Sequence, residues 1–292
     1  MQRARLTRRA ALAGAALASA APALAADPWR SRLTAIEQRL GGRLGVLALD
    51  TGNNRRIAHR EDERFPMCSA FKWLLAAAVL ARADAGRERL DRVIGYGPSD
   101  LFSYAPVARA NVALGGLSVR ELCAAAVEVS DNTAANLLLA SLGGPAGLTR
   151  WLRSIGDPST RLDRPELALN SSIPGDPRDT TTPEAMVGDM RRVLLGTVLS
   201  PASRQLVLDW LVGCRTGLQR LRAGLPRDWR VGDKTGTSGG RWLSCNDLAI
   251  AWPPGRAPIL IFAFSTAGPA GTETREAALA EVGRLVAEWA SA

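Results

Sequence analysis

Lysine and histidine are almost missing from this chain of 292 residues. Of its 37 basic side chains, 35 are arginine, Lys72 and Lys234 are the two lysines, and His59 is the one histidine. The arginine guanidinium stays protonated in proteins, whereas burial or a neighbouring positive charge can convert a lysine ammonium to the neutral amine. Lysine is therefore expected at positions where the side chain must be able to lose its proton, which arginine cannot do. A Ser-His-Asp triad would depend on His59 alone, so proton chemistry is sought in lysines, carboxylates and hydroxyls.

Metal-binding patterns of cysteine are also missing. The four cysteines are Cys68, Cys123, Cys214 and Cys245, with no Cys-x-x-Cys spacing and no histidine partners. This pattern argues against a zinc site, and no metal or other cofactor is expected. An exported protein can form disulfides, but this number of cysteines does not require any.

Long apolar runs and clusters of one charge are absent beyond the first 25 residues. No later run reaches the ~18 apolar residues of a membrane-spanning helix, so no membrane insertion is expected. The formal net charge is +9, and it is +5 without the four arginines of residues 1–25. Because this charge is spread along the chain, nucleic-acid binding is not expected, whereas an anionic small substrate would suit a modest positive field.

Residues 1–25 have the pattern of a signal peptide. They carry four arginines and no acid, then small and apolar residues from Ala10 to Ala21, then the small-x-small sequence Ala23-Leu24-Ala25. This predicts a periplasmic or secreted protein. Thr7-Arg8-Arg9 resembles a twin-arginine signal, but ordinary Sec signals also begin with arginines, so both routes stay open.

Strand patterns occur near both ends of the chain and helical patterns lie between them. A helix is predicted over residues 28–40, strands over 44–49, 56–59, 229–236, 248–252 and 259–265, and a last helix over 273–289. About 150 mostly helical residues start at Ser69, with helix caps at Ser118, Thr182 and Ser200. This order predicts an α/β (α+β) fold, with an antiparallel sheet built from both termini, flanking helices and an inserted all-α domain. The α/β domain would comprise residues 26–60 and 213–292, the all-α domain residues 61–212, and the active site would lie between them.

Ser69-x-x-Lys72 precedes a long apolar run. Residues three apart on a helix share a face, so a hydroxyl and an amine can come into contact there as nucleophile and base. A capping serine followed by a solvated lysine is the simpler interpretation of such a pattern. The scarcity of lysine favours the catalytic interpretation.

Further polar patterns interrupt the chain at three places. Ser130-Asp131-Asn132 breaks a helical run, and Lys234-Thr235-Gly236 closes a predicted strand. Residues 161–179 are rich in proline and charge and include Glu166 and Asn170. Taken singly, these patterns are also typical of a turn, a strand edge and a surface loop held by an Arg164 to Asp179 ion pair.

The order and spacing of Ser69-x-x-Lys72, Ser130-Asp131-Asn132, Glu166-x-x-Leu169-Asn170 and Lys234-Thr235-Gly236 resemble those of the class A serine β-lactamases, from about Trp29 to the C-terminus. The resemblance implies that Ser69 attacks the lactam carbonyl and that either Lys72 or Glu166, through a water, takes its proton. Ser130 would pass a proton to the lactam nitrogen. Glu166 would then activate the water that cleaves the acyl-enzyme.

The resemblance also implies a set of substrate-binding residues, which are Tyr104, Asn132, Asn170, Thr216, Arg220, Lys234, Thr235, Gly236 and Thr237. Asn132 would bind the substrate amide, and Thr235 with Thr237 its carboxylate. Lys234 would hold Ser130 and favour a neutral Lys72, while backbone N–H groups of Ser69 and Thr237 would form the oxyanion hole. A monomer acting on penicillins and cephalosporins is expected, with carbapenems left open.

Several positions depart from the family pattern. Leu167 stands where many relatives have proline, which leaves a cis peptide bond at this position open. Cys245 precedes Asn246 where several relatives keep an arginine, and Arg220 with Thr216 resembles the replacement in other branches. A Cys68 to Cys245 bridge requires Cα atoms within ~7 Å.

Two other functions share part of the pattern. A penicillin-binding DD-peptidase has the serine, the Ser-x-Asn and the Lys-Thr-Gly, but Glu166 with Asn170 argues against it. A β-lactam sensor domain stays acylated, and the lack of a membrane segment argues against that class.

Overall fold

The computed structural model describes residues 28–292, so the predicted signal peptide lies outside the described residues. At the centre is a five-stranded sheet in the order β2-β1-β9-β8-β7, with antiparallel neighbours throughout. Its strands are β1 (Arg43–Asp50), β2 (Arg56–His59), β7 (Arg230–Thr237), β8 (Ser244–Trp252) and β9 (Ile259–Thr266). Because β1 pairs with β9 along its whole length, both ends of the chain build one sheet, and the predicted fold class is confirmed.

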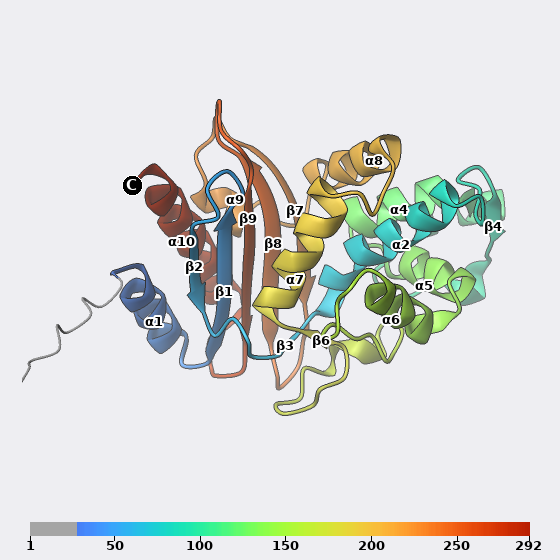
Figure 1. Ribbon diagram of the computed structural model, residues 1–292. Coiled ribbons are helices and arrows are strands. Elements are labelled where there is room, and N and C mark those ends of the chain that lie inside the picture. The colour runs from blue at the N-terminus through green and yellow to red at the C-terminus, as the bar shows by residue number, and fades with distance from the viewer. Residues whose placement is uncertain (1–27) are drawn as a thin grey trace, which may run out of the picture.

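Three helices cover one face of this sheet. They are α1 (Pro28–Leu40), α9 (Leu221–Gly224) and α10 (Thr272–Ser291), and Figure 1 shows α1 and α10 together on one side. Val46 and Ile261 point towards these helices, whereas their strand neighbours Leu47 and Phe262 point to the opposite face. The central strands are therefore apolar on both faces because both are covered.

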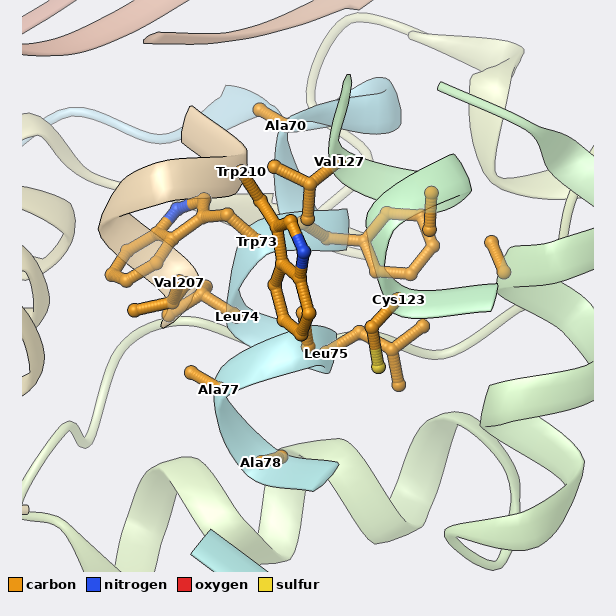
Figure 2. Close-up of a cluster of buried hydrophobic side chains, with 14 of the residues drawn as sticks. Ala70, Trp73, Leu74, Leu75, Ala77, Ala78, Cys123, Val127, Val207 and Trp210 are labelled. Atoms are coloured by element: carbon orange, nitrogen blue, oxygen red, sulfur yellow. The ribbon is translucent and has the colours of Figure 1, made fainter. Parts of the chain in front are cut away.

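The second face meets helices packed around α2 (Lys72–Asp84). The others are α3 (Pro106–Ala110), α4 (Val119–Glu128), α5 (Asn132–Ser141), α6 (Gly144–Ser154), α7 (Pro183–Met190) and α8 (Pro201–Val212). In Figure 2, Trp73 of α2 lies among side chains of α4 and α8, including Val127 and Trp210. An apolar, buried helix thus carries Lys72 as its first residue.

The helical region is less continuous than predicted. Between α2 and α4 the chain forms the short strands β4 (Val93–Gly95) and β5 (Gly116–Ser118), which pair with each other. Short helical turns begin at Pro98 and at Pro106, and Gly115, with a φ of 73°, ends a further turn that begins at Val112. A long helix cannot run through such positions. The domain boundaries given above stay a prediction.

The predicted helix starts are confirmed. Ser118 Oγ accepts a hydrogen bond from Glu121 N, and the Glu121 carboxylate accepts one from Ser118 N, which completes a capping box. Thr182 and Ser200 cap α7 and α8, and each is followed by a proline at the first helical position.

Strand β8 begins at Ser244, before the predicted start at Leu248. Ser244, Asn246 and Asp247 at this end of the strand are polar but buried. Asn246 Nδ2 donates to Pro66 O at 2.7 Å, and Ser244 Oγ donates to Thr266 Oγ1 at 2.8 Å. Such partners come from distant segments, so a hydrophobic pattern alone misses this part of the strand.

The loop 161–179 has its two ends tied together. Arg161 N donates to Thr180 O at 3.0 Å, and Arg164 pairs with Asp179 at 2.6 Å, which confirms the predicted ion pair. Directly after the loop, β6 (Thr180–Thr181) pairs with β3 (Phe65–Pro66), just upstream of Ser69. The loop is therefore anchored beside the predicted nucleophile.

Candidate active site

Ser69 lies in a 3₁₀ turn (Cys68–Phe71) that leads directly into α2. Strand β7 packs closely against this turn at Gly236. A Cβ atom at Gly236 would come within 2.3 Å of Met67 O and 3.0 Å of Ala70 N. Glycine is therefore required there for the end of β7 to lie beside Ser69.

Lys72 is fully buried at the start of α2. Its Nζ lies 2.6 Å from Asn132 Oδ1, 2.9 Å from Ser130 O and 3.0 Å from Glu166 Oε1. Burial lowers the pKa of Lys72, and the nearby Glu166 carboxylate opposes but does not cancel this effect. The amine is thus held closer to its neutral form than an exposed lysine would be.

Glu166 connects Ser69 to Lys72. Ser69 Oγ donates to Glu166 Oε1 at 3.0 Å, and the same oxygen meets Lys72 Nζ. Within residues 28–292 no direct hydrogen bond joins Ser69 Oγ to Lys72 Nζ, so the contact predicted from their spacing runs through Glu166. Asn170 Nδ2 donates to Glu166 Oε2 at 2.6 Å. The carboxylate is therefore fixed from both sides.

Asn136 holds the backbone of Glu166 and was missed by the sequence interpretation. Its Oδ1 accepts from Glu166 N at 3.0 Å, and its Nδ2 donates to Glu166 O at 2.8 Å. The peptide bond between Glu166 and Leu167 is cis, although no proline follows Glu166. The sequence could have indicated Asn136 through its position, because Asn136 lies one helical turn after Asn132 and shares its face of the helix.

Ser130 lies between the two lysines. Lys234 Nζ donates to Ser130 Oγ at 3.1 Å, and Lys72 Nζ lies 3.4 Å from the same oxygen. The backbone φ of Ser130 is 61°, a left-handed conformation at the loop between α4 and α5. Burial lowers the pKa of Lys234 to about 8, and the positive charge of Lys72 contributes to the same shift.

Arg220 and three threonines form the opposite end of the site. Arg220 Nη2 donates to Thr237 Oγ1 at 2.8 Å, and Nη1 donates to Gly236 O at 3.2 Å. Thr216 Oγ1 and Thr235 Oγ1 share a hydrogen bond of 2.5 Å. Arg220 is only 5% exposed and also meets Glu276, so its guanidinium is held in one orientation.

These groups surround a cavity of about 330 Å³. It is lined by Ser69, Ser103, Tyr104, Ser130, Asn132, Leu167, Asn170, Thr216, Arg220, Thr235 and Thr237. The remaining predicted site residues do not line the cavity but are hydrogen-bonded to residues that do. They are Lys72, Glu166, Lys234 and Gly236. His59 takes no part, because its ring is buried against Glu37. Ser103 and Leu167 were not among the predicted residues.

The chain matches the family model described as the Beta-lactamase enzyme family over residues 28–290. A solved ancestral class A β-lactamase, reconstructed for Gram-negative bacteria, is 61% identical and superimposes with a TM-score of 0.87 over 89% of this chain and 99% of that one. This chain belongs to the class A β-lactamases. The enzyme is 50% identical to β-lactamase AST-1 of Nocardia asteroides, over 90% of this chain and 83% of that protein. It is 48% identical to the carbapenem-hydrolysing β-lactamase KPC of Klebsiella oxytoca, over 93% and 90% of the two chains.

All four cysteines of this β-lactamase are free thiols. The Cys68 to Cys245 bridge left open above is therefore not formed in the structure. Cys68 Sγ lies 3.7 Å from Ser172 Oγ, whereas Cys245 is packed in the cluster between the sheet and α10. Burial raises the pKa of Cys68 to about 12, so its thiol stays protonated at neutral pH.

Proposed function

We propose that Ser69 of this enzyme forms the acyl-enzyme with a β-lactam and that Glu166 directs its hydrolysis. The observation that carries the proposal is the position of Glu166 Oε1, which lies 3.0 Å from both Ser69 Oγ and Lys72 Nζ. A nucleophile within hydrogen-bonding distance of a base is the arrangement that nucleophilic catalysis needs. Lys72 and Glu166 are the two groups that can take the proton of Ser69.

Protonation of the lactam nitrogen is assigned to Ser130. Its hydroxyl is bonded to Lys234 and lies within reach of Lys72, so a proton taken from Ser69 has a route of short contacts to the leaving nitrogen. Lys234 is proposed to supply positive potential that favours the neutral amine of Lys72. The backbone N–H groups of Ser69 and Thr237 are proposed as the oxyanion hole.

Deacylation is assigned to a water held by Glu166 and Asn170. Asn170 Nδ2 is bonded to Glu166, while its buried Oδ1 has no hydrogen-bond donor among the described residues. A buried amide oxygen without a donor is a ready acceptor for a water. From this position, Glu166 would take a proton from the water as it attacks the ester on Ser69.

Substrate recognition is assigned to the rim of the cavity. The carboxylate of the β-lactam would meet Thr235, Thr237 and Arg220, and its amide side chain would meet Asn132. Tyr104 is 51% exposed, accepts from Asn132 N through its backbone oxygen and would contact the outer part of the substrate. Thr216 supports this surface through Thr235.

Substrate range, location and assembly belong to the same proposal. Penicillins and cephalosporins are proposed as substrates, and the similarity to a carbapenem-hydrolysing relative makes carbapenems the first further class to test. No helix within residues 28–292 is long and apolar enough to cross a bilayer. We propose an exported monomer, periplasmic or secreted.

Hydrolysis of nitrocefin by the purified protein tests the function. The parent protein should turn over many equivalents, and Ser69→Ala should turn over none. A single stoichiometric burst without further turnover would favour the DD-peptidase or the sensor class. A panel of one penicillin, one cephalosporin and one carbapenem then measures the substrate range.

Arg220→Ala is expected to raise KM for substrates that carry a carboxylate while kcat changes less. A charge-assisted hydrogen bond contributes roughly 1.5–3 kcal/mol, which corresponds to about 10- to 150-fold in affinity. Steady-state kinetics measures the effect. Arg230→Ala serves as the control with little change in KM, because Arg230 lies at the start of β7, stacked on Trp252 and outside the cavity. An unchanged KM in Arg220→Ala would assign carboxylate binding to other residues.

A further inference from the structure

Two acidic side chains with no part in the proposed chemistry are buried against each other. Asp157 follows α6 and Asp189 lies in α7, and both are 0% exposed. Their carboxyl groups lie within hydrogen-bonding contact of each other. Aspartates are rarely buried completely unless they are paired with a partner that satisfies them.

The hydrogen bonds show where a proton is needed. Asp157 Oδ1 accepts from Ser159 N at 2.7 Å and Thr160 N at 3.0 Å, and such bonds favour an ionised carboxylate. Asp189 Oδ1 accepts from Arg192 at 2.7 Å, whereas Asp189 Oδ2 is buried and meets no donor among the described residues. A proton on that oxygen would replace repulsion between two acceptors by a hydrogen bond to Asp157.

The charges around the pair also indicate that one of the two carboxyl groups is protonated. Arg192 is the guanidinium bound to the pair. Arg153 and Arg64 bond to the segment 157–160, but to the backbone oxygens of Asp157, Thr160 and Ser159 and not to a carboxylate. Arg64 also donates to a threonine hydroxyl, and Arg161 is paired within the loop. One bound guanidinium neutralises one carboxylate. The second carboxyl group must therefore be neutral to be buried without a large cost.

The two aspartates differ in their pKa. Burial, the Asp157 charge and the hydrogen bond to Asp157 raise the pKa of Asp189 to about 8, against the opposing effect of Arg192. Burial also acts to raise the pKa of Asp157, but hydrogen bonds from Asp189, Thr160 and Ser159 outweigh it and leave that pKa below its ordinary value. The shared proton therefore resides on Asp189.

The pair lies at the neck of the loop that carries Glu166. Asp157 fixes the backbone of Thr160, and Thr160 Oγ1 is bonded to Thr181 Oγ1 at 2.7 Å across the neck. Asp189 belongs to the helix that follows the loop. The contact between the two aspartates thus joins the segment entering the loop to the helix leaving it.

We propose that Asp157 and Asp189 share one proton and form a positioning pair that holds the neck of the Glu166 loop. Neither side chain lines the cavity, so the pair acts through the loop. The proposal rests on the role of Glu166 proposed above.

Loss of the proton at alkaline pH gives the pair a measurable signature. Above a pH of about 8, two carboxylates would face each other and loosen the neck. Because the folded state keeps a proton that the unfolded chain has already lost, the free energy of unfolding should fall as pH rises from about 4 to about 8 and then level off.

Asp189→Asn tests the pair, because an amide keeps its shape, donates to Asp157 and accepts from Arg192 at every pH. The ratio of kcat in the variant to kcat in the parent should be constant up to about pH 7 and rise severalfold above about pH 8. The melting temperature of the variant relative to the parent should rise over the acid to neutral range. Titration of Lys234 affects both proteins equally and cancels in the ratio. Asp176→Asn is the matched control, since the pKa of Asp176 is about 2 and its ratio should stay flat.

Ratios of kcat and melting temperature that are independent of pH would show that Asp189 is ionised throughout and would overturn the proposal. If Asp189→Asn does not fold, infrared spectroscopy of the parent decides the question. Burial also raises the pKa of Asp233 and Asp247, so the diagnostic signal is the component of the protonated C=O stretch that is lost near pH 8. The absence of such a component would overturn the proposal. A parent that hydrolyses no β-lactam would refute the proposed function, while the thermal and infrared measurements would still test the pair.

Discussion

Glu166→Ala is expected to acylate at Ser69 and then to stop turning over. The Glu166 charge acts to raise the pKa of Lys72, so its removal leaves a buried amine that is more readily neutral and can take the proton of Ser69. Deacylation, in contrast, loses the base that activates its water, a contribution of typically ~10²–10⁴-fold. Mass spectrometry after mixing with a penicillin should show a lasting adduct on the variant and little on the parent.

Glu184→Ala is the matched control for this experiment. Glu184 is an exposed glutamate that pairs with Arg56 on the surface, so its removal should leave turnover unchanged. Normal turnover in Glu166→Ala would reduce Glu166 to a structural loop residue and refute the mechanism. A lasting adduct on the parent would favour a DD-peptidase or a sensor.

Lys72→Arg is expected to abolish acylation although the positive charge is kept. The position is fully buried, and burial lowers the pKa of the lysine. A guanidinium cannot become a neutral base under these conditions, and it is larger than the ammonium that fits between Asn132 and Glu166. Loss of general-base catalysis predicts a fall of about 10²–10⁴-fold in the acylation rate, measured as the burst after rapid mixing.

Arg82→Lys is a control on the same helix, because Arg82 lies in the last turn of α2, away from the cavity. Its burst should match that of the parent. Melting curves of both variants separate loss of chemistry from loss of folding. A burst of normal size and rate in Lys72→Arg would show that no neutral amine is needed at this position.

The catalytic motifs could be predicted because each combines residue types that packing does not require. Ser69 and Lys72 at the start of an apolar helix, and Lys234 within strand β7, have no role in a hydrophobic core. The sequence could not give the contacts between motifs. Glu166 bridges Ser69 and Lys72 only because the loop 161–179 folds back onto α5, where Asn136 holds it.

Buried polar groups account for most of what was missed. Asp189 is an acidic residue among the buried residues of α7, and no neighbouring residue in the sequence indicates that its partner is Asp157, which precedes the loop. The early start of β8 has the same cause, since Asn246 and Ser244 are satisfied by Pro66 and Thr266. Local patterns record which residues are apolar, whereas the partners of buried polar atoms are set by tertiary structure.

The burial of both lysines makes the lysine side chains of the folded enzyme unreactive towards reagents that modify primary amines. Lys72 and Lys234 are each 0% exposed and are the only lysines of the chain. An endoprotease that cuts after lysine should therefore leave the native protein intact and cleave it only when it unfolds, so the digestion rate reports the unfolded fraction. Coupling to a surface through lysine side chains should likewise fail for the folded enzyme and succeed only after unfolding.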